Sequence, residues 1–282
     1  MNAYIIKQRA IKVFCYAFLA ILFVICIIPV YMLLVNSTRS AEEIVRGITL
    51  IPSVHFLDNW RTLTIDFGID IGLGVRNSAI VAFSTTFLSV YFSMLTAYAI
   101  NVYNFRFKKQ FYGFVLAMVL VPGQLFLIGF FQYMSALGLL NTFAPLIIPS
   151  IAAPATVFFC KQYLDAALVP ELIQSARIDG AGEFAIFNKI ALPLAAPGAF
   201  TMAIFAFVAS WNAFMGPLFL IMGNQRLHTL PLIMIRLQGD AFLVDFGAVY
   251  FGMAITLIPI IIIYAIFSRY IITGISLGSV KE

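Results

Sequence analysis

Residues 13–36 read VFCYAFLAILFVICIIPVYMLLVN, an apolar run without a single Asp, Glu, Lys, Arg or His. Because an α-helix rises about 1.5 Å per residue, a helix of this length crosses the roughly 30 Å hydrocarbon core of a bilayer. A cleavable signal peptide has a shorter apolar segment that ends at a small-residue site. We therefore predict that this run is a retained transmembrane helix.

Five further windows share the character of the first. None contains Asp, Glu, Lys, Arg or His, and they cover Ser78 to Ile100, Phe111 to Ser135, Thr142 to Cys160, Leu194 to Met222, and Phe246 to Ser268. The whole chain of 282 residues is 62% hydrophobic and 10% charged, with a mean hydropathy of +1.01. A soluble domain of this size needs more polar surface than that. The sequence predicts an all-α integral membrane protein with six transmembrane helices.

The basic residues indicate how these helices are oriented. Six spans place both termini on one side, and eleven basic residues fall on that side: Lys7, Arg9, Lys12, Arg106, Lys108, Lys109, Lys161, Arg177, Lys189, Arg269 and Lys281. The opposite loops hold Arg39, Arg46, Arg61, Arg76, Arg226 and Arg236. By the positive-inside rule, both termini are predicted to be cytoplasmic. The net charge of +5 does not indicate a nucleic-acid partner, because the basic residues lie between apolar runs and form no stripe.

The chain lacks the residue patterns of an enzyme or of a self-driven pump. Cys15, Cys26 and Cys160 show no metal-ligand spacing, so we expect no metal site, and His55 and His228 lie in outside loops far from any nucleophile. No phosphate-binding GxxxxGK[ST] motif is present, and the spans hold no ionisable residue of the kind that couples transport to ions. We therefore expect no catalytic activity and expect another subunit to supply the energy for transport. A self-contained channel or facilitator remains the alternative.

The loop between the fourth and fifth windows reads PELIQSARIDGAGEFAIFNKIALP over residues 170–193. Pro170 suits the first turn of a helix, and Glu171 complements the helix dipole. Gly180 suits the left-handed conformation that ends a helix, and Asp179 or Gly180 is a candidate cap for the next one. The three-residue spacing of Phe184, Phe187 and Ile190 predicts an apolar edge on that second helix.

The charge of this loop favours a protein partner over a lipid surface. Its basic residues are outnumbered by Asp165, Glu171, Asp179 and Glu183, which anionic headgroups would repel. Two short helices joined by an elbow are well suited to a groove on another protein. The loop is therefore predicted to be a docking element.

Residues 170–197 resemble the EAA loop of the permease subunits of binding-protein-dependent ABC importers. The Glu-Ala-Ala positions are Gln174-Ser175-Ala176 here, followed by Asp179-Gly180-Ala181 and by Ile190-Ala191-Leu192-Pro193. Gln174 and Ser175 depart from the first two letters of the motif. The usual carboxylate is therefore missing, and Glu171, one turn earlier, is its candidate substitute.

Further segments are similar to the maltose-type carbohydrate branch of that family, and together they cover most of the chain from Asn77 onward. They are Asn77-Ser78, residues 121–124 (VPGQ), residues 138–142 (GLLNT), Ser210-Trp211-Asn212, residues 229–231 (TLP) and the tail 273–282. The resemblance implies a type I ABC importer permease fold with cytoplasmic coupling helices. It also implies a bacterial or archaeal cell membrane as the location.

The resemblance further implies the organisation and the partners of the chain. Residues 1–72 hold the cytoplasmic N-terminus, the first helix and an outside loop; residues 73–270 form the five-helix core with the coupling loop 161–193; residues 271–282 are a cytoplasmic tail. The implied partners are a second homologous permease, two ATPase subunits that bind the ATP, and an extracytoplasmic solute-binding protein that delivers a mono- or oligosaccharide. No cofactor is expected on this chain.

The residues expected to couple the loop to the ATPase are Glu171, Gln174, Ser175, Ala176, Asp179, Gly180, Ala181, Phe184, Phe187, Ile190, Leu192 and Pro193. Sugars are read by hydrogen-bonding side chains and by aromatic faces. The candidates for a substrate path are therefore Gln124, Trp211 and Asn212. Pro122-Gly123 beside Gln124 predicts a break in the third window, because proline removes a backbone donor.

Overall fold

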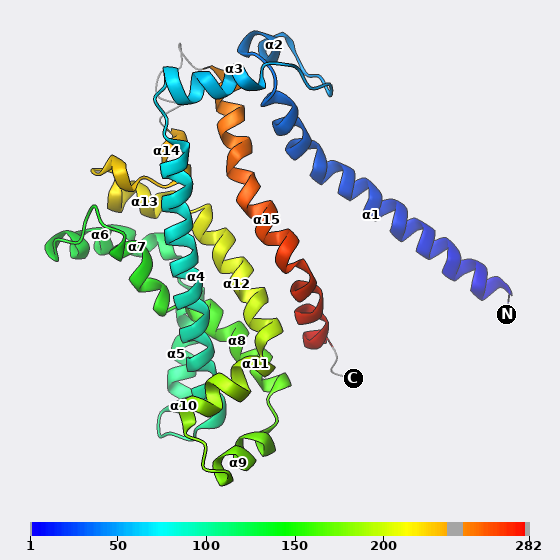
Figure 1. Cartoon of the computed structure of the whole chain (residues 1–282). Coiled ribbons are helices and arrows are strands. Elements are labelled where there is room, and N and C mark those ends of the chain that lie inside the picture. The colour runs from blue at the N-terminus through cyan, green and yellow to red at the C-terminus, as the bar shows by residue number, and fades with distance from the viewer. Residues whose placement is uncertain (1, 236–244, 280–282) are drawn as a thin grey trace. The chain divides into compact units, whose positions relative to one another are not determined.

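The computed structural model describes the backbone of residues 2–235 and 245–279, with the side chains of residue 9 and of residues 11–235 and 245–267. Every regular element in this part of the chain is helical (Figure 1). Three parts of the predictions lie outside the described residues: Arg236 and Lys281, which are predicted to lie on opposite sides of the membrane, and residues 280–282 of the predicted tail. The α-helices are α1 (Asn2–Asn36), α2 (Ala41–Arg46), α3 (Phe56–Arg61), α4 (Ile71–Val102), α5 (Lys108–Leu120), α6 (Leu127–Ala136), α7 (Ala144–Ile147), α8 (Pro154–Ala167), α9 (Pro170–Ile178), α10 (Glu183–Ile186), α11 (Leu192–Leu194), α12 (Ala196–Trp211), α13 (Met215–Ile221), α14 (Leu230–Met234) and α15 (Phe246–Ser279).

Five short segments depart from α geometry. Two are π-helices, η1 (Thr62–Asp66) and η4 (Phe187–Ala191), and three are 3₁₀-helices, η2 (Gly123–Phe126), η3 (Ile148–Ile151) and η5 (Gln225–Leu227). The chain forms two compact units. The first combines Met1–Asp70 with Met234–Ile258, and the second combines Ile71–Ile233 with Pro259–Glu282.

Four helical stretches are long and apolar enough to cross a membrane: Ile11–Asn36, Ile71–Val102, Ala144–Ala167 and Phe246–Phe267. Two more stretches are pairs of helices with a sharp bend between them. Lys108–Leu120 and Gly123–Ala136 meet at 92°, and Glu183–Leu194 and Ala196–Trp211 meet at 80°. Counting each bent pair as one span gives six, the number that hydropathy predicts.

The two bends lie at residues 121–122, inside the window 111–135, and at Ala195, at the start of the window 194–222. The first bend lies at Pro122, as the sequence predicts, because proline disfavours a helical conformation in Val121, which is extended at φ −85° and ψ 121°. In the second window α12 ends at Trp211 and α13 starts only at Met215. Pro217 lies in the first turn of α13, where its missing N–H is not needed.

Prolines also divide the stretch Ala144–Ala167 into three segments. Pro145, Pro149 and Pro154 each occupy one of the first two positions of α7, η3 and α8 respectively. This is the helix end at which proline removes no hydrogen bond. The last segment continues to Ala167, seven residues beyond the predicted end at Cys160.

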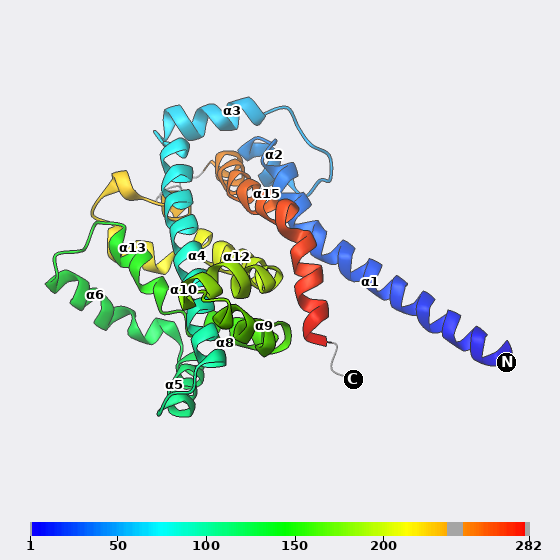
Figure 2. The same cartoon turned by 60° about the horizontal axis from the view of Figure 1, so that its bottom comes forward.

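The second unit is built on α4, whose main packing partners are α8 and α12 (Figures 1 and 2). A Cβ at Gly198 of α12 would lie 2.4 Å from the ring of Tyr163 of α8, so only glycine permits this close approach. At the other end of α4, the amide of Asn77 donates to the carbonyls of Arg226 and His228, and the Ser78 hydroxyl accepts from the N–H of Leu230 at 2.8 Å. These bonds tie η5 and α14 to α4.

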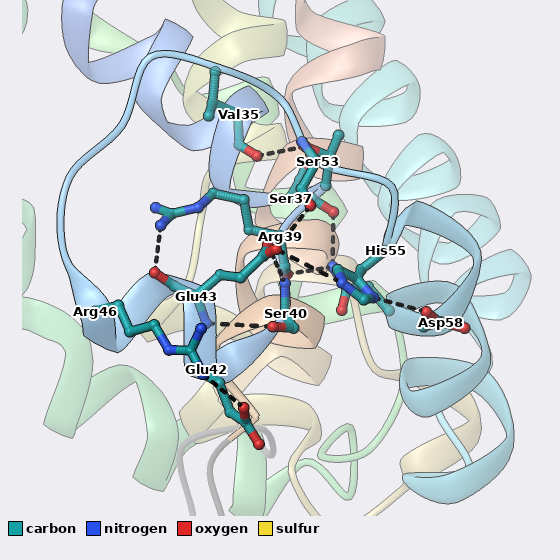
Figure 3. A network of polar contacts seen from close by, with 12 residues as sticks. Val35, Ser37, Arg39, Ser40, Glu42, Glu43, Arg46, Ser53, His55 and Asp58 are labelled. Atoms are coloured by element: carbon teal, nitrogen blue, oxygen red, sulfur yellow. Dashed lines mark hydrogen bonds and ion pairs between the residues drawn. The ribbon is translucent and has the colours of Figure 1, made fainter.

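In the first unit, a buried polar network follows α1 (Figure 3). Arg39 is 6% exposed and donates to the Asn36 amide oxygen at 3.0 Å, to the Gly47 carbonyl at 2.9 Å and to the Glu43 carbonyl. Asn59 of α3 donates to the carbonyls of Ser37 and Arg39, both at 2.9 Å. The network therefore fixes the chain that leads from α1 to α3.

The same network caps α2 and holds the following loop. Ser40 and Glu43 form a reciprocal capping box at the start of α2. The Glu43 carboxylate also accepts a hydrogen bond from the Ser53 hydroxyl at 3.1 Å, and His55 lies 2.9 Å from Asp58 (Figure 3). Local side-chain chemistry rather than an apolar core organises this segment.

Candidate functional site

The loop 170–193 folds into the predicted elbow. Helix α9 begins at Pro170 and ends at the C-cap Asp179, and Gly180 then has φ +79°. Gly180 N–H donates to Arg177 O and Ala181 N–H donates to Ala176 O, the paired bonds of a Schellman ending. The predicted role of Gly180 in ending this helix is confirmed. The predicted cap of the second helix is wrong, because Gly182 caps α10 and no side chain contributes.

The inner face of the elbow is anchored in the second unit. Ile173 and Ala176 of α9 and three residues of α10 and η4 (Ile186, Phe187 and Ala191) are buried in one apolar cluster. The same cluster contains Met94, Ala97 and Tyr98 of α4 together with Cys160 and Leu164 of α8. The elbow is therefore packed on both α4 and α8.

The outer face of the elbow presents apolar side chains that nothing in the described chain covers. Ile178 is 87% exposed and Phe184 is 69% exposed. Ile178 is not in the predicted coupling set; besides Phe184, the exposed members of that set are Glu171, Gln174, Ser175, Asp179, Gly180 and Pro193. Ala181, Ile190 and Leu192 are half-buried, whereas Ala176 and Phe187 are buried. We refer to Glu171, Gln174, Ser175, Ile178, Asp179, Gly180 and Phe184 as the outer face.

The predicted apolar edge of Phe184, Phe187 and Ile190 is divided. Phe184 points outward, while Phe187 is 1% exposed and its ring lies 5.4 Å from that of Tyr98. Phe184 lies in α10, whereas Phe187 and Ile190 lie in the π-helical η4, so the three residues do not belong to one regular α-helix. An α-helical spacing argument cannot anticipate this change of helix type.

A polar cluster that the sequence argument missed joins the two arms of the elbow. Arg177 of α9 donates to Glu183 of α10 twice, from Nε to Oε1 at 2.6 Å and from Nη2 to Oε2 at 3.2 Å. The hydroxyls of Tyr103 and Tyr98 donate to the same carboxylate at 2.5 and 3.4 Å. The only sequence signal was a pair of opposite charges flanking Asp179-Gly180-Ala181.

The hydroxyl of Tyr103 and the guanidinium of Arg177 both respond to this environment. Burial, together with the hydrogen bond to Glu183, raises the pKa of Tyr103. The hydrogen bond to Glu183 raises the pKa of Arg177 further above its ordinary value. The Arg177 guanidinium also lies 5.8 Å from the centre of the Tyr103 ring. The cluster therefore favours a neutral tyrosine beside a charged ion pair.

The second unit also contains a pocket of about 470 Å³. Among the described residues that line it, none carries a charge. Most of the lining side chains are apolar, and Thr85, Ser89, Ser150, Thr156 and Ser210 add hydroxyl groups. Thr85 bonds Ser210 at 2.8 Å, and Ser89 donates to Thr156 at 3.3 Å. The pocket is therefore suited to a neutral, hydroxyl-bearing molecule.

The three predicted path residues do not line this pocket. Trp211 is buried and stacks on Phe207 with ring centres 5.7 Å apart, so it contributes to packing. Gln124 lies in η2 at the bend and Asn212 caps α12, and both are exposed. In the described part of the chain, no group of three His, Cys, Asp or Glu side chains is placed to hold a metal ion.

Comparison with known proteins gives concordant matches. The family described as "Binding-protein-dependent transport system inner membrane component" matches residues 89–276. The arabinooligosaccharides transport system permease protein of Halalkalibacterium halodurans is 37% identical over 269 residues, 94% of each protein. The trehalose/maltose transport system permease protein of Thermococcus litoralis is 30% identical over 262 residues, 92% of each protein.

A solved structure matches over nearly the whole fold. One chain from the crystal structure of a bacterial ABC transporter involved in the import of the acidic polysaccharide alginate superposes with a TM-score of 0.78. The match covers 94% of this chain and 97% of that one at 20% sequence identity. At that identity the likeness shows the fold, which is the one that the sequence resemblance implies.

Proposed function

This chain belongs to the family of binding-protein-dependent transport system inner membrane components, and on that premise we propose that it is the permease subunit of an ATP-driven sugar importer. The two relatives above are named for arabinooligosaccharides and for trehalose and maltose, which supports a sugar as the solute. The chain is thus a multi-pass membrane protein. Both termini face the cytoplasm in this proposal, because most basic residues fall on that side.

The observation that carries the proposal is the two-sided elbow. Its inner face is buried against α4 and α8, while its outer face exposes Ile178 and Phe184. We place an ATPase subunit on the outer face, so that closure of two ATPases on ATP displaces α9 and, through the buried cluster, the long helices. Packed helices pass on such displacements as rigid bodies. ATP binds only to the partners, and this chain has no catalytic role.

We infer the remaining partners from the family to which the chain belongs. A second homologous permease completes the path, and an extracytoplasmic binding protein delivers the solute on the face opposite the elbow. The pocket lined by Thr85 and Ser210 is our candidate for this chain's share of the path, with Gln124 and Asn212 at exposed positions and Trp211 supporting the walls. Because its described lining carries no charge, we expect neutral saccharides to be preferred over phosphorylated or carboxylated ones.

The elbow can be tested at Gly180, where a Cβ would meet nothing within 4 Å. In Gly180→Trp, the indole obstructs the outer face, and the ATPase subunits should no longer co-purify with the permease. The matched control is Gly68→Trp, because Gly68 also has a positive φ, +60°, and open space, but lies outside the elbow. Both variants carry the same kind of backbone strain, so a difference between them reports the location.

The measurement is ATPase co-purification together with sugar uptake by proteoliposomes that contain the complete importer. We expect Gly180→Trp to insert normally, to lose the ATPase and to lose uptake, while Gly68→Trp retains the ATPase. Normal ATPase binding and uptake in Gly180→Trp would refute the proposed docking face. ATP-independent sugar flux through the purified chain alone would favour the alternative, a channel or facilitator.

A further inference from the structure

The two arms of the elbow are joined by a short turn in which the N–H groups of Gly180 and Ala181 bond back to α9, so these bonds hold the end of α9 and not the start of α10. Gly180 and Gly182 both lie in it, and a Cβ at either position would meet nothing within 4 Å. Glycine leaves the backbone many conformations, and no neighbouring side chain restricts these two. The apolar cluster beneath the elbow resists separation, but apolar contact is not directional. Some other interaction must therefore set the angle between α9 and α10.

The Arg177–Glu183 pair supplies a directional contact at this place. Two parallel N–H···O bonds between a planar guanidinium and a carboxylate fix orientation as well as distance. Arg177 lies in the last turn of α9 and Glu183 is the first residue of α10, so the pair spans the turn. The Oε2 atom of Glu183 is held in addition by Tyr103 and Tyr98.

The tyrosines extend this contact to the body of the unit. Tyr98 is a buried residue of α4, and Tyr103 follows the end of that helix by one residue. Lys108 of α5 donates to the Tyr103 carbonyl at 3.0 Å, which restrains the connecting chain. One carboxylate is thus bonded by α9, by α4 and by the segment that leads to α5.

We propose that Arg177, Glu183, Tyr103 and Tyr98 form a latch that holds α9 and α10 at a fixed angle and ties both to the end of α4. This inference rests on the proposed function and adds positioning residues to it. The latch converts a push on the outer face into a movement of α4. Without it, α9 swings about Gly180 and Gly182, and ATP hydrolysis proceeds with less transport.

The test uses the complete importer in proteoliposomes and measures sugar transported per ATP hydrolysed. Glu183→Gln and Arg177→Gln break the pair from either side at exposed positions and keep the side-chain size close to the original. Each should lower the ratio by about threefold or more, within the range by which mutations alter coupling between sites. The double variant should be no worse than either single one, because the two residues form one interaction.

A matched control is the Lys161–Asp165 ion pair, which is also 2.6 Å long but lies within the single helix α8. Asp165→Asn removes an equally short ion pair without affecting the turn, and the ratio should stay at the wild-type value. ATPase co-purification is measured in every variant and should be unchanged, because neither Arg177 nor Glu183 is among the residues of the outer face.

Three outcomes would overturn the latch. The first is a wild-type ratio in both single variants. The second is a double variant whose loss equals the sum of the two single losses, which would mean that the residues act independently. The third is loss of the bound ATPase, which would mean that Arg177 and Glu183 bind the ATPase directly. If the wild-type importer transports without ATP, the proposed function itself fails and the latch fails with it. ATP-driven wild-type transport with unaffected variants removes the latch alone.

Discussion

Arg39 and Arg177 each bond across the junction between two helices, α1 and α2 for Arg39 and α9 and α10 for Arg177, yet they do so in opposite surroundings. Arg39 is buried, and its acceptors are all neutral: one amide oxygen and two backbone carbonyls (Figure 3). The side chain of Arg177 is 38% exposed and faces a carboxylate that is 43% exposed. Arg39 is a buried cation stabilised by neutral hydrogen-bond acceptors, whereas Arg177 belongs to a solvent-accessible ion pair.

Burial determines what each contact is suited for. A buried cation is stable only while every one of its acceptors stays in place, so it favours a single rigid arrangement. An exposed ion pair contributes only about 0–1 kcal/mol, because water and salt compete with it. Its value lies in geometry, and it can loosen and re-form without unfolding the chain. The rigid contact lies in the unit with the long outside loop, and the adjustable one lies in the elbow.

The strongest test of this comparison is Arg39→Met. Removing the guanidinium leaves the carbonyls of Glu43 and Gly47 and the Asn36 amide without their donor, at a cost of about 2–3 kcal/mol in local stability. Hydrogen exchange of residues 40–59 in the purified protein measures that cost. The control is Arg46→Met, since the Arg46–Glu42 pair is 3.6 Å long and highly exposed; its effect should stay within about 0.5 kcal/mol. Equal exchange in the two variants would contradict the rigid role of Arg39.

A smaller effect is expected from Tyr103→Phe, which tests the contact of Glu183 with the end of α4. The substitution removes the hydroxyl that donates to Glu183 but leaves the Arg177 pair intact. Transport per ATP should therefore fall only about twofold, at the lower end of reported coupling effects. Tyr98→Phe removes a longer hydrogen bond to Glu183, of 3.4 Å, so transport per ATP should decrease by less than twofold in this variant. A loss as large as that of Glu183→Gln would mean that the tyrosine, rather than the ion pair, sets the angle.

Sequence reasoning succeeded where one or two residues determine local geometry. Pro170 and Gly180 define α9 because their backbone preferences hold in almost any surroundings. The break at Pro122 follows for the same reason. The division of the window 194–222 into α12 and α13 was not predicted, because hydropathy indicates which residues lie in the membrane but not where a helix changes direction. The Arg177–Glu183 pair has no helical spacing, and the tyrosines that complete it are distant in sequence.

The smallest predicted effect concerns acid pH in the loop that Glu43 holds. The hydrogen bond from Ser53 is the largest cause of a lowered pKa for Glu43, and the bond from the Ser40 N–H and the charges of His55 and Arg39 act in the same direction. A carboxyl whose pKa is lowered in the folded state stabilises the fold at pH values above its ordinary pKa of 4.5, and that stability is lost as the pH falls through the lowered pKa.

The acid response can be measured by labelling with 5-fluorotryptophan, which gives two fluorine signals. One is from Trp60, next in sequence to the network residue Asn59, and the other is from Trp211 in the other unit, which serves as an internal reference. We expect the Trp60 signal to shift below about pH 4.5 in the wild type and in Glu42→Gln, but not in Glu43→Gln. The shift should be modest, because Glu43 is accessible to water; an identical profile in Glu43→Gln would assign the acid response to another carboxyl, such as Asp58.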